Sequence, residues 1–139
     1  MDNLFLLYNN PNLNYKIIAK EFLEKYCGSV VIGLFNIGHY YDNNSLITLH
    51  IVHNNIRYVY EFIGYNNFKC KLFDMKCDCI RFYNITPTFQ PTGKNDMLII
   101  FYGKAEINNI HYNVITSFII NISTVLPKII NQTIEFLAL

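Results

Sequence analysis

The sequence predicts an α+β domain in which helices near the N-terminus pack on one face of a curved antiparallel sheet. The clearest helical spacing of apolar residues lies in the first third of the chain, and long runs rich in Ile, Tyr and Phe follow it. Apolar residues make up 52% of the 139 residues, which is enough for a buried core without disulfides. We therefore expect residues 1–139 to form a single domain.

Residues 15–27 are predicted to form the first helix. Asn14 precedes them as a suitable N-cap. The apolar residues Ile17, Ile18, Phe22 and Tyr26 are expected on one side of this helix, while charged residues occupy the rest of its surface. Gly28 is expected to end or bend the helix.

The segment that follows is predicted to contain a short second helix, a polar loop and the first strand. The second helix covers residues 30–35 and the loop covers residues 39–44. Residues 45–52 are typical of a strand, and a turn follows at residues 53–55.

Residues 56–68 are consistent with either a strand or a helix, because their apolar residues have helical spacing in a run of β-formers. The pair Asn66-Asn67 is a natural stop for this segment. Residues 69–76 show no clear pattern.

The last part of the chain predicts the main strands of the sheet. A long strand is expected over residues 77–90 and a last strand over residues 129–137. Between them, residues 97–105 and 110–122 form the two arms of a hairpin. Asn108-Asn109 is a plausible two-residue turn, because Asn tolerates positive φ better than most residues. The hairpin is expected at the centre of the sheet.

Composition argues against several function classes. The net charge is +1 and the basic residues are dispersed, so no nucleic-acid surface is expected. No apolar run reaches the length of a membrane-spanning helix, and we expect no membrane association. The N-terminus lacks the pattern of a signal peptide, so the four cysteines are expected to be reduced. Cys77 and Cys79 lack a second pair at zinc-knuckle spacing, so neither a metal site nor a cofactor is expected.

Several short motifs occur in a characteristic order along the chain. They are FLEKY at residues 22–26, YDNNSL at 41–46, TFQP at 88–91, the apolar run ending in glycine at 98–103, VITSF at 114–118 and INQTIEF at 130–136. Together they resemble the nuclear transport factor 2 family, whose cone-shaped α+β fold encloses an apolar cavity. Gln132 departs from the family pattern, which usually has Asp there. The segment from Phe68 to Gln90 is also longer than its equivalent in the family, so residues 69–76 are a candidate insertion.

The resemblance implies four groups of site residues. The cavity that accepts an aromatic side chain would be lined by Leu49, Ala105, Ile107 and Ile134. The rim of the cone would carry His50, Glu106, Asn108 and Asn109. The sheet face of a homodimer or heterodimer would include Ile115, Ser117 and Ile119. Tyr15 and Phe22 are candidates for binding the Phe-Gly repeats of nucleoporins, although Tyr15 is alternatively an aromatic residue that covers the core.

The function implied by this resemblance is a non-catalytic protein-binding module in nucleocytoplasmic transport, located in the cytoplasm and nucleus. Nucleoporin Phe-Gly repeats, Ran or an mRNA-export receptor would be its partners. In the family, acidic residues at the rim recognise Ran-GDP. Here Asn108-Asn109 leave only Glu106 nearby, which weakens the case for Ran-GDP because opposite charge provides steering and register.

Two other functions stay open. The same cone hosts isomerases and dehydratases, so a small-molecule binder or enzyme is one alternative. The candidate catalytic groups are His50, His53, His111, Asp74 and Asp78. None of them has the spacing of an acid–base pair, and the chain is therefore predicted not to be an enzyme. A scaffold of the stress-granule type that docks Phe-rich peptides is the other alternative.

Overall fold

The computed structural model describes residues 11–123 and 125–139. In chain order its elements are α2 (Pro11–Val30), the 3-10 turns η1 (Leu34–Asn36) and η2 (Gly38–Tyr40), β1 (Tyr41–His53), β2 (Ile56–Ile63), α3 (Tyr65–Asp74), β3 (Arg81–Pro91), β4 (Asp96–Ile107), β5 (Ile110–Asn121) and β6 (Lys128–Ala138). The described helices are all too short or too polar to cross a membrane.

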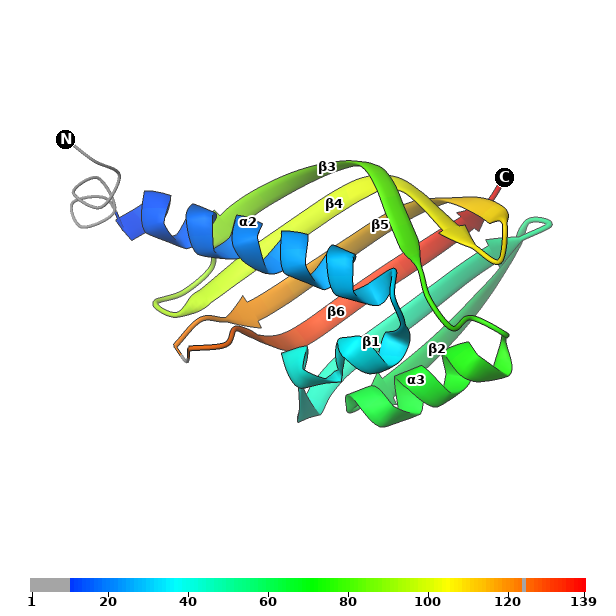
Figure 1. The fold of residues 1–139 in the computed structure, drawn as a ribbon, viewed down its shortest axis with the longest axis horizontal. Coiled ribbons are helices and arrows are strands. Elements are labelled where there is room, and N and C mark those ends of the chain that lie inside the picture. Colours follow the sequence, from blue (N-terminus) through cyan, green and yellow to red (C-terminus); the bar gives the residue numbers. More distant parts are fainter. Residues whose placement is uncertain (1–10, 124) are drawn as a thin grey trace.

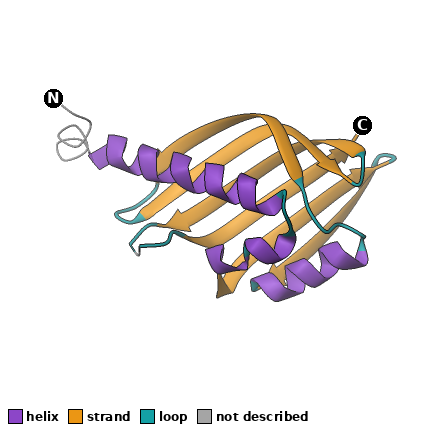
Figure 2. Cartoon of the chain, in the orientation of Figure 1, coloured by secondary structure: helices purple, strands orange, loops and turns teal. Residues whose placement is uncertain are grey.

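The strands form one curved six-stranded sheet in the order β2-β1-β6-β5-β4-β3, and the helices lie on one side of it (Figures 1 and 2). We call that side the inner face and the opposite side the outer face. The expected α+β architecture is confirmed. The sheet is mixed in one place, because β6 is antiparallel to β5 but parallel to β1.

The predicted hairpin forms, but it is not at the centre of the sheet, because β6 and β5 are the middle strands and β4 lies next to the edge strand β3. β4 and β5 pair from Asp96 with Asn121 to Ile107 with Ile110. Asn108 and Asn109 have φ values of 52° and 66°, the left-handed pair that a tight hairpin turn requires. On β4, Met97, Ile99 and Phe101 are fully buried on the inner face. The residues that alternate with them belong to the outer face, which none of the described helices covers (Figure 1).

Two predictions between the first helix and the first strand are wrong. Residues 30–35 are not a second helix: α2 continues to Val30, and only the short turns η1 and η2 follow. Residues 39–44 are not a solvated loop, because Tyr40 and Tyr41 are buried and β1 already begins at Tyr41. Burial of these two aromatic rings outweighs the polar residues around them.

The segment without a clear pattern is helix α3. Phe68 and Leu72 stand four residues apart on one side of α3, and both are buried. Asn66-Asn67 does not stop the segment but lies in the first turn of this helix. The strand predicted over residues 77–90 begins only at Arg81. The reason is that the carbonyl of Asp78 accepts from the N–H of Leu34 in η1, and the N–H of Ile80 donates to the carbonyl of Val30 at the end of α2, instead of pairing with a strand.

Candidate functional site

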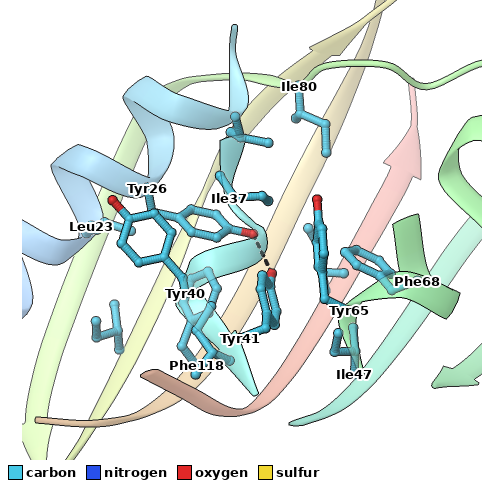
Figure 3. Close-up of a cluster of buried hydrophobic side chains, with 14 of the residues drawn as sticks. Leu23, Tyr26, Ile37, Tyr40, Tyr41, Ile47, Tyr65, Phe68, Ile80 and Phe118 are labelled. Carbon is cyan, nitrogen blue, oxygen red and sulfur yellow. Dashed lines mark hydrogen bonds between the residues drawn. The ribbon is translucent and has the colours of Figure 1, made fainter. Parts of the chain in front are cut away.

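The side chains beneath α2 form an aromatic cluster on the inner face (Figure 3). Phe22 packs edge-on against Tyr40 and Phe118, with ring centroids 5.3 Å and 6.1 Å away. Tyr26 packs edge-on against Phe118 at 5.1 Å. These rings are buried because α2 presents Phe22 and Tyr26 on the same side, one turn apart. They fix the position of α2 on the sheet.

A polar network runs through this cluster. Tyr26 and Tyr41 are joined by a hydrogen bond of 2.8 Å between their hydroxyl groups, and Tyr41 donates to Oε1 of Gln132 over 2.5 Å. Burial raises the pKa of Tyr26 to about 12 and raises the pKa of Tyr41 well above its ordinary value. At neutral pH these tyrosines are therefore fixed hydrogen-bond donors and not sources of protons.

A groove lies between α2 and the segment that joins β5 to β6, and we call it the α2 groove. Its volume is about 200 Å³. Its walls come from Ile18, Glu21, Phe22, Lys25, Tyr40, Ile122, Val125, Leu126 and Pro127. The groove is smaller than the roughly 300–1,000 Å³ typical of small-molecule pockets, so it matches one or two side chains better than a whole cofactor.

One ion pair stands at the solvent side of the α2 groove. Nζ of Lys25 lies 2.8 Å from Oε1 of Glu21, and both side chains are about 60% exposed or slightly more. The hydrogen bond to Glu21 raises the pKa of Lys25. An exposed pair of this kind adds little stability. It does give an apolar groove a charged edge that a ligand can reach.

Tyr15, one of the two residues proposed for Phe-Gly binding, does not line the α2 groove. It is half-buried against the core, and its hydroxyl donates to the backbone carbonyl of Lys94. This hydrogen bond ties the start of α2 to the β3–β4 connection. Phe22, the other residue, forms part of the groove floor.

The residues proposed for the cone cavity are core residues in this structure. Leu49, Ala105 and Ile134 are at most 1% exposed. Ile107 lines a small cavity of about 60 Å³ together with Ile51, Leu72, Met75, Cys77, Tyr112 and Phe136. Three of these residues come from α3 and the turn after it, so the segment interpreted as an insertion helps to line this cavity.

Similar solved structures identify the fold of this chain. Nuclear transport factor 2 (Ntf2) from Cryptosporidium parvum matches with a TM-score of 0.72 and 20% sequence identity, over 90% of this chain and 96% of that chain. The chain has the nuclear transport factor 2-like fold.

Two further structures share this fold. Yeast UBP3-associated protein BRE5 matches with a TM-score of 0.68 and 20% identity, over 88% of this chain and 95% of that chain. The C. albicans Mtr2–Mex67 M domain complex contains a match with a TM-score of 0.68 and 7% identity, over 89% of this chain and 95% of that chain. A scan against protein-family models finds no match, and neither does a search of curated proteins.

The rim of this nuclear transport factor 2-like domain carries one carboxylate among its proposed residues. Oε1 of Glu106 accepts a hydrogen bond of 2.7 Å from Arg81, and its Oε2 lies 3.8 Å from Nε2 of His111. Asn108 donates to the backbone carbonyl of Lys76, while Asn109 is exposed. Because Glu106 is already paired with Arg81, the rim offers no free acidic cluster at this point.

His50 lies on the outer face, as strand parity from the buried Leu49 predicts. Nη1 of Arg57 lies 3.1 Å from Nδ1 of His50 and 3.0 Å from Oε1 of Glu135. This cluster stands at the polar end of the outer face.

The rest of the outer face carries an apolar patch between polar residues such as Glu61 and Thr133. Ile115 is 44% exposed, and Ser117 and Ile119 are half-buried beside it. Leu46, Ile63 and Tyr102 extend the same apolar surface on other strands and are between 49% and 63% exposed. A patch with an apolar centre and a charged edge has the composition of a protein interface.

The candidate catalytic groups do not meet in one place. His53, Asp74, Asp78 and His111 are exposed, and His50 lies on the outer face. Within the described residues, the buried side chains classed as polar are Ser45, Thr116 and Gln132. Among these residues no group of three or more His, Cys, Asp or Glu could hold a metal ion.

Sequence reasoning missed most residues of the α2 groove. Ile18 was visible as the residue one turn before Phe22. Tyr40, Ile122 and Pro127 had no local signal, because they reach the groove from segments far apart in the sequence.

Proposed function

We propose that this chain is a non-catalytic protein-binding module of nucleocytoplasmic transport. Its α2 groove holds a Phe side chain of a Phe-rich peptide, such as a nucleoporin Phe-Gly repeat, and its outer face binds a second domain. The α2 groove is the observation that carries the proposal.

The chemistry of the groove supports a Phe side chain as the ligand. Phe22 and Tyr40 supply aromatic surface, and Ile18 and Ile122 supply aliphatic surface. An aromatic ring gains both buried apolar area and edge-to-face contacts in such a site. The exposed Glu21–Lys25 pair at its edge leaves room for the peptide backbone to continue into solvent.

The inner face supports a non-catalytic role. General acid–base catalysis needs a carboxylate, imidazole or similar group placed against the substrate. The described inner face instead carries apolar side chains together with tyrosines, Ser45, Thr116 and Gln132. The narrow cavity beside Ile107 also leaves little space for a small-molecule substrate.

Peptide titration with two matched variants tests the groove. Ile18→Glu places a charge inside the groove, whereas Ile17→Glu changes a neighbouring residue of α2 that is 41% exposed and does not line it. We expect a Phe-Gly repeat peptide to bind the wild type and Ile17→Glu alike, and to lose at least about tenfold in affinity for Ile18→Glu. A peptide with Ser in place of Phe should not bind. Equal binding to both variants would contradict the groove assignment.

The outer face supports a second domain as partner, either another copy of this chain or a related chain. A large exposed apolar patch is unusual for a monomer. Ile115→Glu would place a charge in its middle without disturbing the buried inner face. If the proposal holds, sedimentation of the wild type shows a larger assembly than sedimentation of Ile115→Glu, which lacks the outer-face contact. A folded wild-type monomer at micromolar concentration would leave only the heterodimer, which capture of a related domain must then show.

The assignment to nucleocytoplasmic transport rests on the fold shared with a nuclear transport factor and on the groove. Ran-GDP is not expected as a partner, because Glu106 is engaged by Arg81 and Asn108 and Asn109 replace acidic residues. A pull-down with both nucleotide states of Ran checks this point, and capture of Ran-GDP would show that another surface binds it. Imaging of the tagged chain should find it in both cytoplasm and nucleus.

A further inference from the structure

The two edges of the sheet are built differently. β3 forms one edge, and it carries Pro87, Pro91 and an irregularity in its pairing where Asn84 has φ 52°. Prolines and bulges are devices that prevent further strand pairing. β2 forms the other edge. It runs for eight residues, IRYVYEFI, without proline, glycine or a shift in its pairing with β1.

The side chains of β2 are open to solvent along half of the strand. Ile56, Arg57, Tyr58 and Val59 are all exposed, and the apolar members of this group are between 45% and 53% exposed. A long, regular and largely apolar edge strand is a surface prepared for another strand.

The sequence of β2 is self-complementary in the antiparallel direction. When two copies of residues 56–62 pair about Val59, Arg57 stands opposite Glu61 of the partner subunit, and the same pair repeats on the other side of the axis. The remaining pairs are Tyr58 with Tyr60 and Ile56 with Phe62, each formed twice. Opposite charges and aromatic pairs at directly opposed positions stabilise a sheet.

This pairing also keeps outer-face residues beside outer-face residues and inner-face residues beside inner-face residues. Arg57, Val59 and Glu61 pair with Val52, His50 and Thr48 on the outer face of their own sheet, while Tyr60 and Phe62 pair with the buried Leu49 and Ile47. A two-fold axis perpendicular to the sheet keeps outer faces together. Two six-stranded sheets would thus become one continuous sheet.

Within the single chain, the charged groups of Arg57 and Glu61 are not fully used, so they can form the pair between two copies. Among the described residues, Glu61 has no ion-pair partner, although it lies next to the Arg57 cluster on the strand. Arg57 uses Nη1 for both Glu135 and His50, and a guanidinium has further N–H donors. Each end of the paired strands would therefore match an unused carboxylate with an arginine that can still donate.

We propose that two copies of this chain associate edge to edge through antiparallel pairing of β2, centred on Val59. This association uses a surface separate from the α2 groove and from the centre of the outer face, and it does not depend on the proposed function. Where the outer face also pairs, edge pairing would join the resulting dimers into larger assemblies.

Charge reversal tests the pairing. Glu61→Arg opposes arginine with Arg57 of the partner subunit, and Arg57→Glu opposes glutamate with Glu61 of the partner subunit, so each variant alone should associate roughly tenfold or more weakly than the wild type. An equimolar mixture of the two variants restores both opposite-charge pairs and should recover association. The measurement is sedimentation of the full chain in an Ile115→Glu background, which removes the outer-face contact. A mixture that associates no better than the separate variants would overturn the proposal.

Cross-linking tests the same contact without relying on affinity. With the exposed Cys70 and Cys79 changed to Ser, Val59→Cys places two thiols opposite each other at the axis and should give a disulfide-linked dimer on mild oxidation. Thr88→Cys in the same background is the control, because it is exposed on the β3 edge. No linked dimer from Val59→Cys, or equal linking from both variants, would also overturn the proposal.

Discussion

The hydroxyl oxygens of Tyr26 and Tyr41 lie 2.8 Å apart inside the core, and both are tied to the same buried amide. Tyr41 donates to Oε1 of Gln132, which leaves Tyr26 as the donor to Tyr41. Nε2 of Gln132 lies 3.4 Å from the Tyr26 oxygen and completes the ring. The three buried side chains serve as hydrogen-bond partners for one another, because water does not reach them. Polar contacts therefore join α2, β1 and β6 in addition to apolar ones.

Removal of either hydroxyl should lower stability, but by different amounts. Tyr41→Phe leaves Oε1 of Gln132 without its donor and the O–H of Tyr26 without its acceptor, and a buried polar group without a partner costs about 1–3 kcal/mol. Tyr26→Phe keeps the short Tyr41–Gln132 bond and should cost less. Urea denaturation of both variants measures the free energies of unfolding. An equal or larger loss of stability for Tyr26→Phe would show that the Tyr41–Gln132 hydrogen bond does not contribute more than the contacts of the Tyr26 hydroxyl.

High pH should destabilise the domain through the same buried tyrosines. Burial raises the pKa of Tyr26 to about 12, while an unfolded tyrosine has a pKa near 10. The resulting stabilisation is complete below pH 10, since both states are then protonated. It is lost as the pH rises from about 10 towards 12, because only the unfolded state releases the proton in that interval.

Urea denaturation between pH 8 and pH 11.5 checks this linkage. Each tyrosine that stays protonated only in the native state contributes a slope of up to about 1.4 kcal/mol per pH unit above pH 10. Tyr41 is raised in the same direction and adds to the effect. The Tyr26→Phe variant should show a shallower slope than the wild type. An identical slope would mean that Tyr26 titrates normally in the native state.

The hairpin of β4 and β5 and the first helix could be predicted because their signals are local. The alternation of apolar residues along β5 sets which side of the strand faces the core, and Val114, Thr116 and Phe118 are buried as that alternation requires. Ile18 and Phe22 likewise share one side of α2. In each case the residues that decide the structure are close in sequence.

The errors lie where long-range packing decides the structure. Tyr41 looked like part of a polar loop, but its ring stacks on Tyr65 at 4.6 Å and its hydroxyl reaches Gln132. Residues 77–80 have strand-forming neighbours, yet Leu34 and Val30 take their backbone hydrogen bonds. The spacing of residues along the chain predicts neither the packing partners of Tyr41 nor the hydrogen-bond partners of residues 77–80. The α2 groove was missed for the same reason.

A methyl group at Gly103 should destabilise the sheet, whereas one at Gly28 should not. A Cβ at Gly103 would lie 2.7 Å from the carbonyl oxygen of Asn84, because β3 bends towards β4 there. Overpacking against backbone costs about 1–3 kcal/mol. At Gly28, inside α2, a Cβ meets nothing within 4 Å. Gly28→Ala should therefore gain up to about 1 kcal/mol from helix propensity.

Thermal and urea denaturation of the two alanine variants measure these changes. Because they introduce the same methyl group, their opposite signs would separate steric conflict from a general effect of replacing glycine. A neutral Gly103→Ala would show that β3 can move away from β4 at little cost, and the close approach at the bulge would then not restrict residue 103.

The Asn-Asn pairs of the described residues occur in turns, in a helix and, at Asn43-Asn44, in strand β1. Asn108-Asn109 and Asn54-Asn55 form turns with φ values between 52° and 66°, whereas Asn66-Asn67 lies in α3. The turns form where strands on both sides pair at once, while Asn66-Asn67 is held helical by burial of Phe68 and Leu72 after it. Alanine should therefore act in opposite directions at the two sites.

Asn109→Ala should lower the free energy of unfolding by about 1 kcal/mol, because alanine tolerates the left-handed region less well than asparagine. Asn66→Ala should raise it by a few tenths of a kcal/mol, since alanine has the higher helix propensity. Both side chains are exposed, so neither change removes a buried contact. Urea denaturation of the two variants makes the comparison. If both variants changed the free energy of unfolding in the same direction, backbone conformation would not decide the effect. Side-chain contacts at one of the two sites would then outweigh the conformational preference.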